Sequence, residues 1–208
     1  MRFRSRHAVA GVVALAALLS ACTSSPPGTL AEPGPSLDVQ VDVDTPQLRA
    51  QKKKAGVQQC EPGTATAQPG GMPDLTLPCL GGGPDVNLAT VQGPVVLNLF
   101  AQWCGPCRVE LPFYQRLHEA ADGRLTVLGV DYLDTQPGRA LELVQEAGVT
   151  YPLLADPGSR LHAPFRVRGL PVLVLVDGTG RVAYRQAVAV DSYAQLRGLV
   201  EKHLGIRL

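Results

Sequence analysis

The 208-residue sequence has almost no net charge, few histidines and few cysteines, and each shortage excludes a class of protein. Nineteen basic and 18 acidic residues give a formal net charge of +1, so no nucleic-acid partner is predicted. The four histidines are scattered and show no ligand spacing with the five cysteines, so no metal site and no cofactor are predicted. The apolar stretch at residues 9–19 is shorter than the about 20 residues of a dedicated membrane span.

Residues 1–21 are predicted to be a lipoprotein signal peptide. A basic start precedes the apolar residues 9–19, and small residues lead to Cys22. Residues 19–22, Leu-Ser-Ala-Cys, resemble a bacterial lipobox, which implies cleavage before Cys22 and lipidation of that residue. The alternative is an ordinary signal peptide with an incidental Cys22. Cleavage leaves a net charge of −2, and export places the chain outside the cytoplasm, on the cell membrane, where disulfides persist.

Residues 22–71 are predicted to form a membrane tether that carries one short helix. Pro, Gly, Ser and Thr are frequent in residues 23–45, as in flexible linkers. A Thr-Pro pair then predicts a helix over 47–55, which Gly56 ends. The three lysines at 52–54 either contact anionic lipid or form a solvated helix face, and the solvated face is favoured.

Cys104 and Cys107, separated by Gly-Pro, stand directly after an apolar run and directly before an amphipathic run. This position predicts Cys104 at the N-cap of a helix, where free N–H groups and a partial positive charge favour a thiolate. In such motifs the thiol pKa falls from about 8.5 to roughly 3.5–7.5. Cys104 is therefore predicted to attack a disulfide, and Cys107 to resolve the mixed disulfide.

Three other interpretations of Cys104 and Cys107 are weaker. A zinc site needs a second ligand pair, and Cys60 and Cys79 are not spaced as one. A haem attachment site needs histidine after the second cysteine, where this sequence has Arg108. An inert structural disulfide conflicts with a helix start that keeps one sulfur reactive.

Cys60 and Cys79 flank a loop rich in glycine and proline and are predicted to form a structural disulfide. In the loop-entropy model, closing a ring of this size stabilises the fold by roughly 3 kcal/mol. The rival hypothesis is a second redox pair that exchanges electrons with Cys104–Cys107. It is weaker because neither Cys60 nor Cys79 stands at a predicted helix start.

Apolar runs and helical periodicities alternate along the domain predicted over residues 72–208. The predicted strands cover residues 74–77, 86–88, 95–100, 125–131, 152–155, 171–176 and 181–186. The predicted helices cover residues 105–121, 137–147, 159–165 and 192–204. Strands that alternate with helices and end in a hairpin predict an α/β domain, with a central mixed β-sheet flanked by helices.

This pattern resembles the thioredoxin fold, and more closely the TlpA/ResA-like thiol–disulfide oxidoreductases, over about residues 72–207. Residues 137–155 look like the helix and strand that TlpA-like proteins insert into the fold. Pro112, inside the helix after the cysteines, matches the helix-kinking proline of the family. The active-site loop of the family is similar to Trp103-Cys104-Gly105-Pro106-Cys107, and its cis-proline loop to Gly169-Leu170-Pro171.

The resemblance implies roles for three further residues. A cis bond before Pro171 would face the cysteines, with the Leu170 backbone free to pair with an extended substrate segment; a simple strand start is the alternative for Pro171. Thioredoxin has a buried acid on the strand below the cysteines, whereas this sequence has Asn98. Family members have an acid at the position of Glu110, which is hypothesised to handle the proton of Cys107; a surface glutamate favoured by the helix dipole is the alternative.

The implied function is that of a membrane-tethered, extracytoplasmic oxidoreductase acting on protein disulfides or dithiols, which a membrane-embedded thiol reductant restores. Gly-Pro is the thioredoxin pair, and the thioredoxin potential of about −270 mV lies on the reducing side. The resemblance therefore implies a reductive task, such as keeping the Cys-x-x-Cys-His of apocytochrome c reduced. The alternatives are a disulfide-introducing oxidase recycled by a membrane oxidant, and a redox-inert lipoprotein that binds a partner. A peroxidase of the peroxiredoxin type is the weakest alternative because Thr-x-x-Cys is absent at the helix start.

Overall fold

The structure is a computed structural model of the chain, and it describes residues 40–208. The predicted signal peptide, Cys22 and the first part of the predicted tether lie outside the described residues. All the strands and helices described below belong to one compact unit of the chain.

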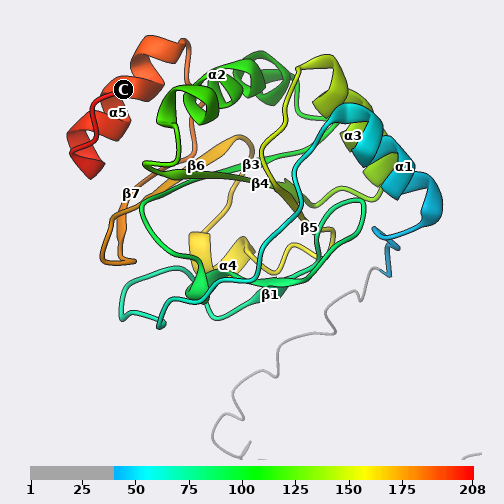
Figure 1. Ribbon diagram of the computed structural model, residues 1–208, viewed down its shortest axis with the longest axis horizontal. Coiled ribbons are helices and arrows are strands. Elements are labelled where there is room, and N and C mark those ends of the chain that lie inside the picture. Colours follow the sequence, from blue (N-terminus) through cyan, green and yellow to red (C-terminus); the bar gives the residue numbers. More distant parts are fainter. Residues whose placement is uncertain (1–39) are drawn as a thin grey trace, which may run out of the picture. The chain divides into compact units, whose positions relative to one another are not determined.

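A five-stranded mixed sheet forms the centre of this unit, in the order β5-β4-β3-β6-β7 (Figure 1). Strands β3, β4 and β5 are parallel, whereas β6 is antiparallel to β3 and β7 is antiparallel to β6. Two short strands pair separately. The strand bounds are β1 (Thr76–Leu77), β2 (Val86–Asn87), β3 (Val95–Phe100), β4 (Thr126–Tyr132), β5 (Leu153–Asp156), β6 (Val172–Val176) and β7 (Val182–Gln186). The predicted thioredoxin-like fold is confirmed, including the inserted helix and strand, α3 and β5.

Helices cover the sheet on both faces, and α2 and α5 pack together on one of them (Figure 1). Helix α3 belongs to the same apolar core as α2 and α5, while α4 contributes to a second core with the β1–β2 hairpin. The helix bounds are α1 (Pro46–Ala55), α2 (Gly105–Ala121), α3 (Pro137–Glu146), α4 (His162–Phe165) and α5 (Tyr193–Leu204), with a 3₁₀ turn at Leu88–Thr90.

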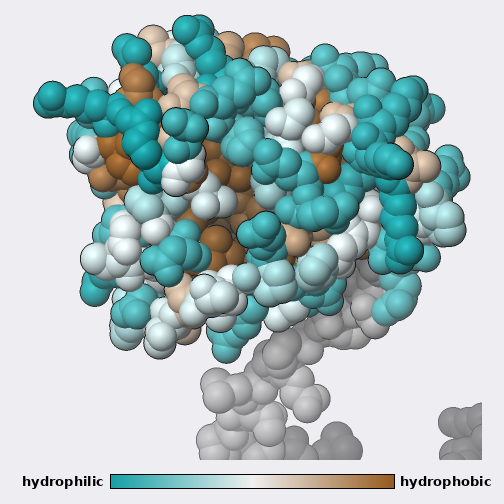
Figure 2. All heavy atoms as spheres, in the orientation of Figure 1, coloured by the Kyte–Doolittle hydropathy of each residue, from teal (hydrophilic) through white to brown (hydrophobic). Residues whose placement is uncertain are grey.

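Strand β3 separates the two cores, because its residues alternate between the faces of the sheet. Val96 and Phe100 belong to the core under α2, and Leu97 and Leu99 to the core under the hairpin. Asn98 shares the α2 side by the same alternation. A strand buried on both faces in this way has the continuous apolar character that predicted it. The surface is largely hydrophilic in the view of Figure 2, with apolar residues visible in recesses between polar ones.

Helix α1 packs against α3, so the part of the predicted tether that the structure describes is not a free linker. Val43, Leu48 and Val57 are buried in the core under α2. The folded unit therefore begins earlier than residue 72. The favoured interpretation of the lysines at 52–54 is wrong for Lys52, which is only 2% exposed. One turn separates Lys52 from Leu48, so both side chains lie on the buried face of the helix.

The last helix begins one residue later than predicted. Its N-cap is Ser192, whose hydroxyl oxygen accepts a hydrogen bond from the Gln195 N–H at 3.2 Å. Within residues 40–208, every helix is too short or too polar to span a membrane.

Candidate active site

Cys104 and Cys107 lie where β3 gives way to α2. Cys104 is the N-cap of α2, with φ −85° and ψ 102°, and its Sγ accepts a hydrogen bond from the Cys107 N–H at 3.2 Å. Pro106 occupies the first turn of α2, where backbone N–H groups have no partner within the helix. The N–H that proline lacks therefore costs no hydrogen bond there. A disulfide joins the two cysteines, with 5.3 Å between their Cα atoms. The site is therefore seen in its oxidised form, with Cys104 at the positive end of the helix dipole.

The surroundings of the disulfide differ between its two sulfurs. Cys107 is fully buried, whereas Cys104 retains 4% exposure. Gly105 and Pro106 between them are exposed, and so is Trp103, at 52%. An incoming thiol or disulfide therefore reaches Cys104 before Cys107, which agrees with the predicted order of attack.

The loop before β6 approaches the same end of β3. Val172 pairs with Leu99, so Leu170 and Pro171 lie beside the chain that leads to Cys104. The Leu170–Pro171 peptide bond is cis, as the resemblance implied. Leu170 is half-buried and packs against both cores.

Glu110 is buried on α2, one turn beyond Cys107 and on the same helix face. Its Oε2 accepts a hydrogen bond from the Val190 N–H at 3.0 Å, while Oε1 has no partner in the part of the chain that the structure describes. Burial raises the pKa of Glu110 to about 7, and the Val190 hydrogen bond opposes part of that rise. The alternative of a surface glutamate is excluded. A carboxyl that titrates near neutral pH is suited to exchange a proton with a neighbouring thiol.

Asn98 lies on the strand below α2 and is fully buried. Its side-chain amide interacts with the buried Tyr151 hydroxyl. It does not titrate, so it offers no proton to the cysteines, and Glu110 is the buried acid on this helix.

Two buried acids that the sequence did not single out lie close to the active-site loop, and one of them, Asp134, hydrogen-bonds to it. Asp134 accepts a hydrogen bond from the Gln102 N–H at 2.8 Å through Oδ2, and one from the Gln136 N–H at 2.9 Å through Oδ1. Asp131, at the end of β4, is buried beside it, and burial followed by the charge of Asp134 raises the pKa of Asp131 well above its usual value. An acid at the end of an otherwise apolar strand was the signal in the sequence.

A group of exposed apolar side chains is contributed by segments that contact the site. Its members are Trp103, Val109, Leu133 and Val188. The Trp103 indole N–H donates to the Leu133 carbonyl at 3.2 Å, and Leu133 adopts a left-handed backbone conformation with φ 52°. Of these residues only Trp103 was singled out in the sequence.

The second cysteine pair lies away from α2. A disulfide joins Cys60 to Cys79, with 5.9 Å between Cα atoms, and both residues are buried in the core that includes the β1–β2 hairpin. Among residues 40–208, no cluster of three or more histidine, cysteine or acidic side chains is arranged to hold a metal.

The fold, the oxidised Cys-x-x-Cys pair at a helix start and the cis-proline that precedes β6 define a thioredoxin-like thiol–disulfide oxidoreductase. Comparison with known families agrees, because residues 71–185 match the AhpC/TSA family. That match covers more than half of the chain, and the chain belongs to this family.

Curated relatives carry thiol–disulfide names. The chain is 34% identical over 146 residues to the thiol:disulfide interchange protein CycY of Rhizobium leguminosarum bv. viciae, which covers 68% of this chain and 74% of that protein. It is 36% identical over 102 residues to DsbE of Escherichia coli, covering 49% of this chain and 53% of DsbE. The alignment thus spans about half the length of DsbE.

Solved structures share the fold. A secreted thiol-disulfide isomerase from Corynebacterium glutamicum superposes with a TM-score of 0.55 at 29% identity, covering 64% of this chain and 83% of that one. A secreted disulfide oxidoreductase of Mycobacterium tuberculosis, homologous to E. coli DsbE, gives a TM-score of 0.56 at 23% identity, over 62% of this chain and 96% of that one. The second likeness bears on the fold alone.

Proposed function

We propose that the chain is a membrane-anchored, extracytoplasmic oxidoreductase that reduces protein disulfides with Cys104 and Cys107. The observation that carries the proposal is the position of Cys104. It caps α2, its sulfur accepts a hydrogen bond from the Cys107 N–H, and the cis Leu170–Pro171 segment lies beside the chain that leads to it. The same N–H stabilises a thiolate once the disulfide is opened.

The reaction follows from the two sulfurs. The Cys104 thiolate bonds to one sulfur of the substrate disulfide, whose other sulfur leaves as a thiolate and takes up a proton. The Cys107 thiol then gives its proton to Glu110 and bonds to Cys104 Sγ, which releases the second substrate sulfur. Two electrons pass to the substrate, and the enzyme is left with the Cys104–Cys107 disulfide that the structure contains.

Glu110 accepts the proton of Cys107 in this reaction. Its burial, its unpaired Oε1 and its pKa of about 7 support the role, because the carboxylate is then present in a substantial fraction at neutral pH. Helical spacing places it on the Cys107 side of α2. When the disulfide is next reduced, the same carboxyl returns the proton to Cys107.

Substrate recognition combines the cis-proline loop with the exposed apolar group. The backbone of Leu170 pairs with an extended substrate segment, as in strand addition to a sheet edge. Trp103 and Leu133, 52% and 49% exposed, supply apolar contact on the cysteine side. A protein segment with a disulfide flanked by apolar residues fits this surface.

The substrate class and the direction come from the family. The TlpA/ResA resemblance supports reduction of the Cys-x-x-Cys-His disulfide of apocytochrome c, with a membrane-embedded thiol reductant restoring Cys104–Cys107. Residues 1–21 are removed in this proposal and Cys22 carries the lipid, so the folded domain stays close to the membrane-embedded reductant. Phase partitioning in detergent, compared between the wild-type chain and Cys22→Ala, tests the anchor.

Trapping in cells tests the reaction. Cys107→Ser leaves the first mixed disulfide unresolved, so covalent adducts on Cys104 accumulate, whereas the matched Cys104→Ser variant forms none. Adducts that contain apocytochrome c support the substrate class. Equal adduct levels in the two variants contradict the order of attack and favour a redox-inert binding protein.

The redox state of the wild-type pair tests the direction. Acid quenching followed by alkylation should show Cys104–Cys107 mainly reduced in cells if the chain is a reductase. A pair that is mainly oxidised while substrate proteins acquire disulfides contradicts reduction and identifies an oxidase.

A further inference from the structure

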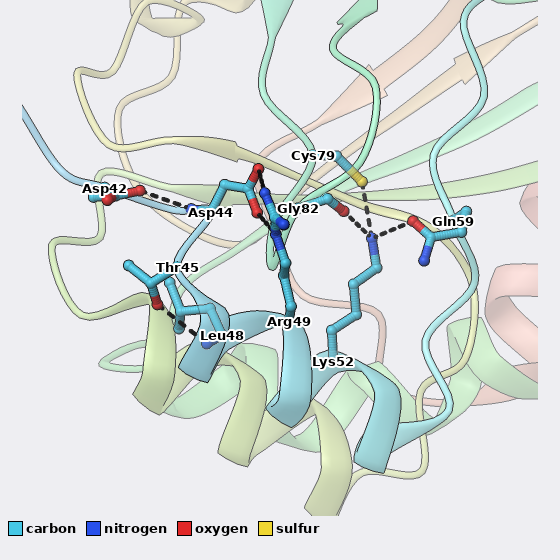
Figure 3. A network of polar contacts seen from close by, with 9 residues as sticks. All are labelled: Asp42, Asp44, Thr45, Leu48, Arg49, Lys52, Gln59, Cys79 and Gly82. Atoms are coloured by element: carbon cyan, nitrogen blue, oxygen red, sulfur yellow. Dashed lines mark hydrogen bonds and ion pairs between the residues drawn. The ribbon is translucent and has the colours of Figure 1, made fainter.

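A buried lysine lies against the second disulfide, Cys60–Cys79. Lys52 Nζ donates hydrogen bonds to Cys79 Sγ at 3.0 Å and to the Gly82 carbonyl at 2.8 Å (Figure 3). The Gln59 side-chain oxygen, at 3.5 Å, completes its contacts. None of these three partners carries a negative charge, so the ammonium is buried among neutral groups.

The acids around Lys52 do not neutralise it. Asp44 acts on Lys52 only at a distance, because its carboxylate is held by Arg49 through two hydrogen bonds of 2.5 and 2.8 Å. None of the ion pairs formed within residues 40–208 includes Lys52. Burial accordingly lowers the pKa of Lys52 from its usual 10.5. Removal of a buried amine from water is costly unless a counterion is present.

Opening the disulfide would create such a counterion, because a thiol is an acid and a disulfide sulfur is not. A cation within hydrogen-bonding distance typically raises the acid dissociation constant of a neighbouring group by roughly ten- to a thousand-fold. Cys79, not Cys60, has this cation. The sulfur that leaves most easily in thiol–disulfide exchange is the one whose thiolate is most stable, and here that is Cys79.

Cys60 and Cys79 are both almost fully buried, at 2% and 1% exposure, but of the two only Cys60 borders a cleft. Cys60 lines a cleft of about 620 Å³ whose walls also include Glu61, Val86 and Val91. In the described chain Cys79 does not line this cleft; it lies beneath Gly83, whose position leaves no room for a side chain beside the sulfur. The pair is therefore asymmetric, with attack directed to one sulfur and charge stabilised on the other.

We propose that Cys60–Cys79 is a second redox-active site, opened by a small dithiol, with Cys79 as the leaving thiolate and the Lys52 ammonium as its counterion. A thiolate of the dithiol bonds to Cys60 Sγ, the Cys60–Cys79 bond breaks, and its electron pair leaves with Cys79. The second thiol of the reagent then displaces Cys60, which takes up one proton.

The number of protons that the protein takes up distinguishes this exchange from the reduction of an ordinary disulfide. Two electrons pass from the dithiol to the protein, and the dithiol loses two protons. One proton ends on Cys60 and the other goes to solvent, because Cys79 remains charged. Reduction is then favoured about tenfold for each unit of pH over the range in which Cys79 is a thiolate and the free dithiol is protonated.

The equilibrium with dithiothreitol tests the site. The full chain carrying Cys104→Ser and Cys107→Ser, which silences the first pair, is equilibrated with mixtures of reduced and oxidised dithiothreitol between pH 6 and 8. After acid quenching and alkylation, peptide mass spectrometry measures the fraction of Cys60 and Cys79 reduced. We expect that fraction, at a fixed thiol ratio, to rise with pH.

The charge of Lys52 is tested by Lys52→Gln, which retains a donor for the Gly82 carbonyl but not the cation. We expect the equilibrium constant for reduction to fall about tenfold at pH 7.5, and its pH dependence between 6 and 8 to vanish. Lys54→Gln, an exposed neighbour on the same helix, should behave as the parent chain.

Three results would overturn the proposal. The first is a parent chain whose equilibrium with dithiothreitol does not change with pH, a measurement that needs no lysine variant. The second is an unchanged equilibrium constant in Lys52→Gln. The third is a Cys60–Cys79 disulfide that dithiothreitol reduces only after a denaturant has unfolded the chain. The active-site pair is absent from this experiment, so its outcome is independent of the proposed function.

Discussion

Glu110 on α2 and Val190 before α5 are joined across the core, because the Val190 N–H donates to Glu110 Oε2 at 3.0 Å. The bond leaves Glu110 Oε1 without a partner among residues 40–208. The hydrogen bond thus fixes the orientation of the Glu110 carboxyl, while Oε1 stays available to accept a proton. Burial raises the pKa of Glu110 to about 7, although this hydrogen bond opposes part of the rise, and the stability of the domain therefore depends on pH.

Glu110→Gln should remove that dependence. The folded pKa is raised from an ordinary 4.5 to about 7, so the folded chain binds a proton that the unfolded chain has already released between those pH values. The stabilisation is complete below about pH 4.5 and is lost as pH rises through 7. Relative to the glutamine variant, the oxidised wild-type domain should lose about 3 kcal/mol across this window. Denaturant unfolding from pH 4 to 8 measures the difference.

Glu119→Gln, which alters an exposed carboxylate on the same helix, is the matched control and should leave the pH profile of stability unchanged. Parallel profiles for wild type and Glu110→Gln would show that Glu110 does not titrate in this range. The same variant separates stability from chemistry. If Glu110 accepts the proton of Cys107, the reduction of substrate should slow although the protein is more stable at pH 7.5.

Asp134→Asn should weaken the active-site loop. Both carboxylate oxygens of Asp134 accept backbone N–H groups, and an amide replaces one acceptor with a donor that faces the N–H of Gln102 or Gln136. An unsatisfied buried donor costs about 1–3 kcal/mol, which chemical denaturation at pH 5 should detect. Asp131→Asn is the comparison. The pKa of Asp131 is raised well above its usual value, so a neutral amide should cost less there. Equal losses of stability in Asp134→Asn and Asp131→Asn would contradict the different roles assigned to these two acids.

The regular elements were predictable because the apolar pattern of each is read locally. The predicted strand 95–100 and helix 105–121 have the same bounds as β3 and α2. The predicted bounds of the other sheet strands, and of the helices that cover the sheet, lie within a few residues of the observed ones. The continuous apolar run, the proline in the first turn and the cysteine at the cap are all local signals. They place Cys104 and Cys107 without knowledge of the rest of the chain.

The contacts that the sequence did not reveal are those between distant segments. Lys52 belongs to a run of three lysines that indicates a solvated face, and only the packing of α1 on the domain shows which of the three is buried. Its spacing from Leu48 was the one available signal. Asp134 supports Gln102 across 32 residues, a relation fixed by the pairing of β3 with β4 and not by local pattern.

Leu133→Asn should separate substrate binding from stability. Leu133 is half-exposed with φ 52°, a conformation that asparagine adopts at lower cost, so the variant should be equal in stability or up to about 1 kcal/mol more stable. Loss of the apolar side chain beside Trp103 should nevertheless raise the KM for a protein substrate several-fold and leave the reactivity of Cys104 towards a small alkylating agent unchanged. Arg166→Asn is the matched control, because Arg166 has φ 45° and is exposed on the separate α4 segment. An unchanged KM in Leu133→Asn would show that the Leu133 side chain does not contribute to substrate binding.

Leu48→Ala tests whether the folded unit extends to α1. Leu48 is buried in the core under α2, and truncation of a buried leucine to alanine typically costs 2–5 kcal/mol. A single cooperative transition shifted by an amount in that range, measured by denaturant unfolding, is expected if α1 unfolds together with the sheet. Gln47→Ala, on the exposed side of the same helix, should change stability by less than about 0.5 kcal/mol. A main transition that does not move in Leu48→Ala would mean that α1 detaches at little cost. Residues 40–57 would then behave as part of the tether, and the domain boundary near residue 72 would stand.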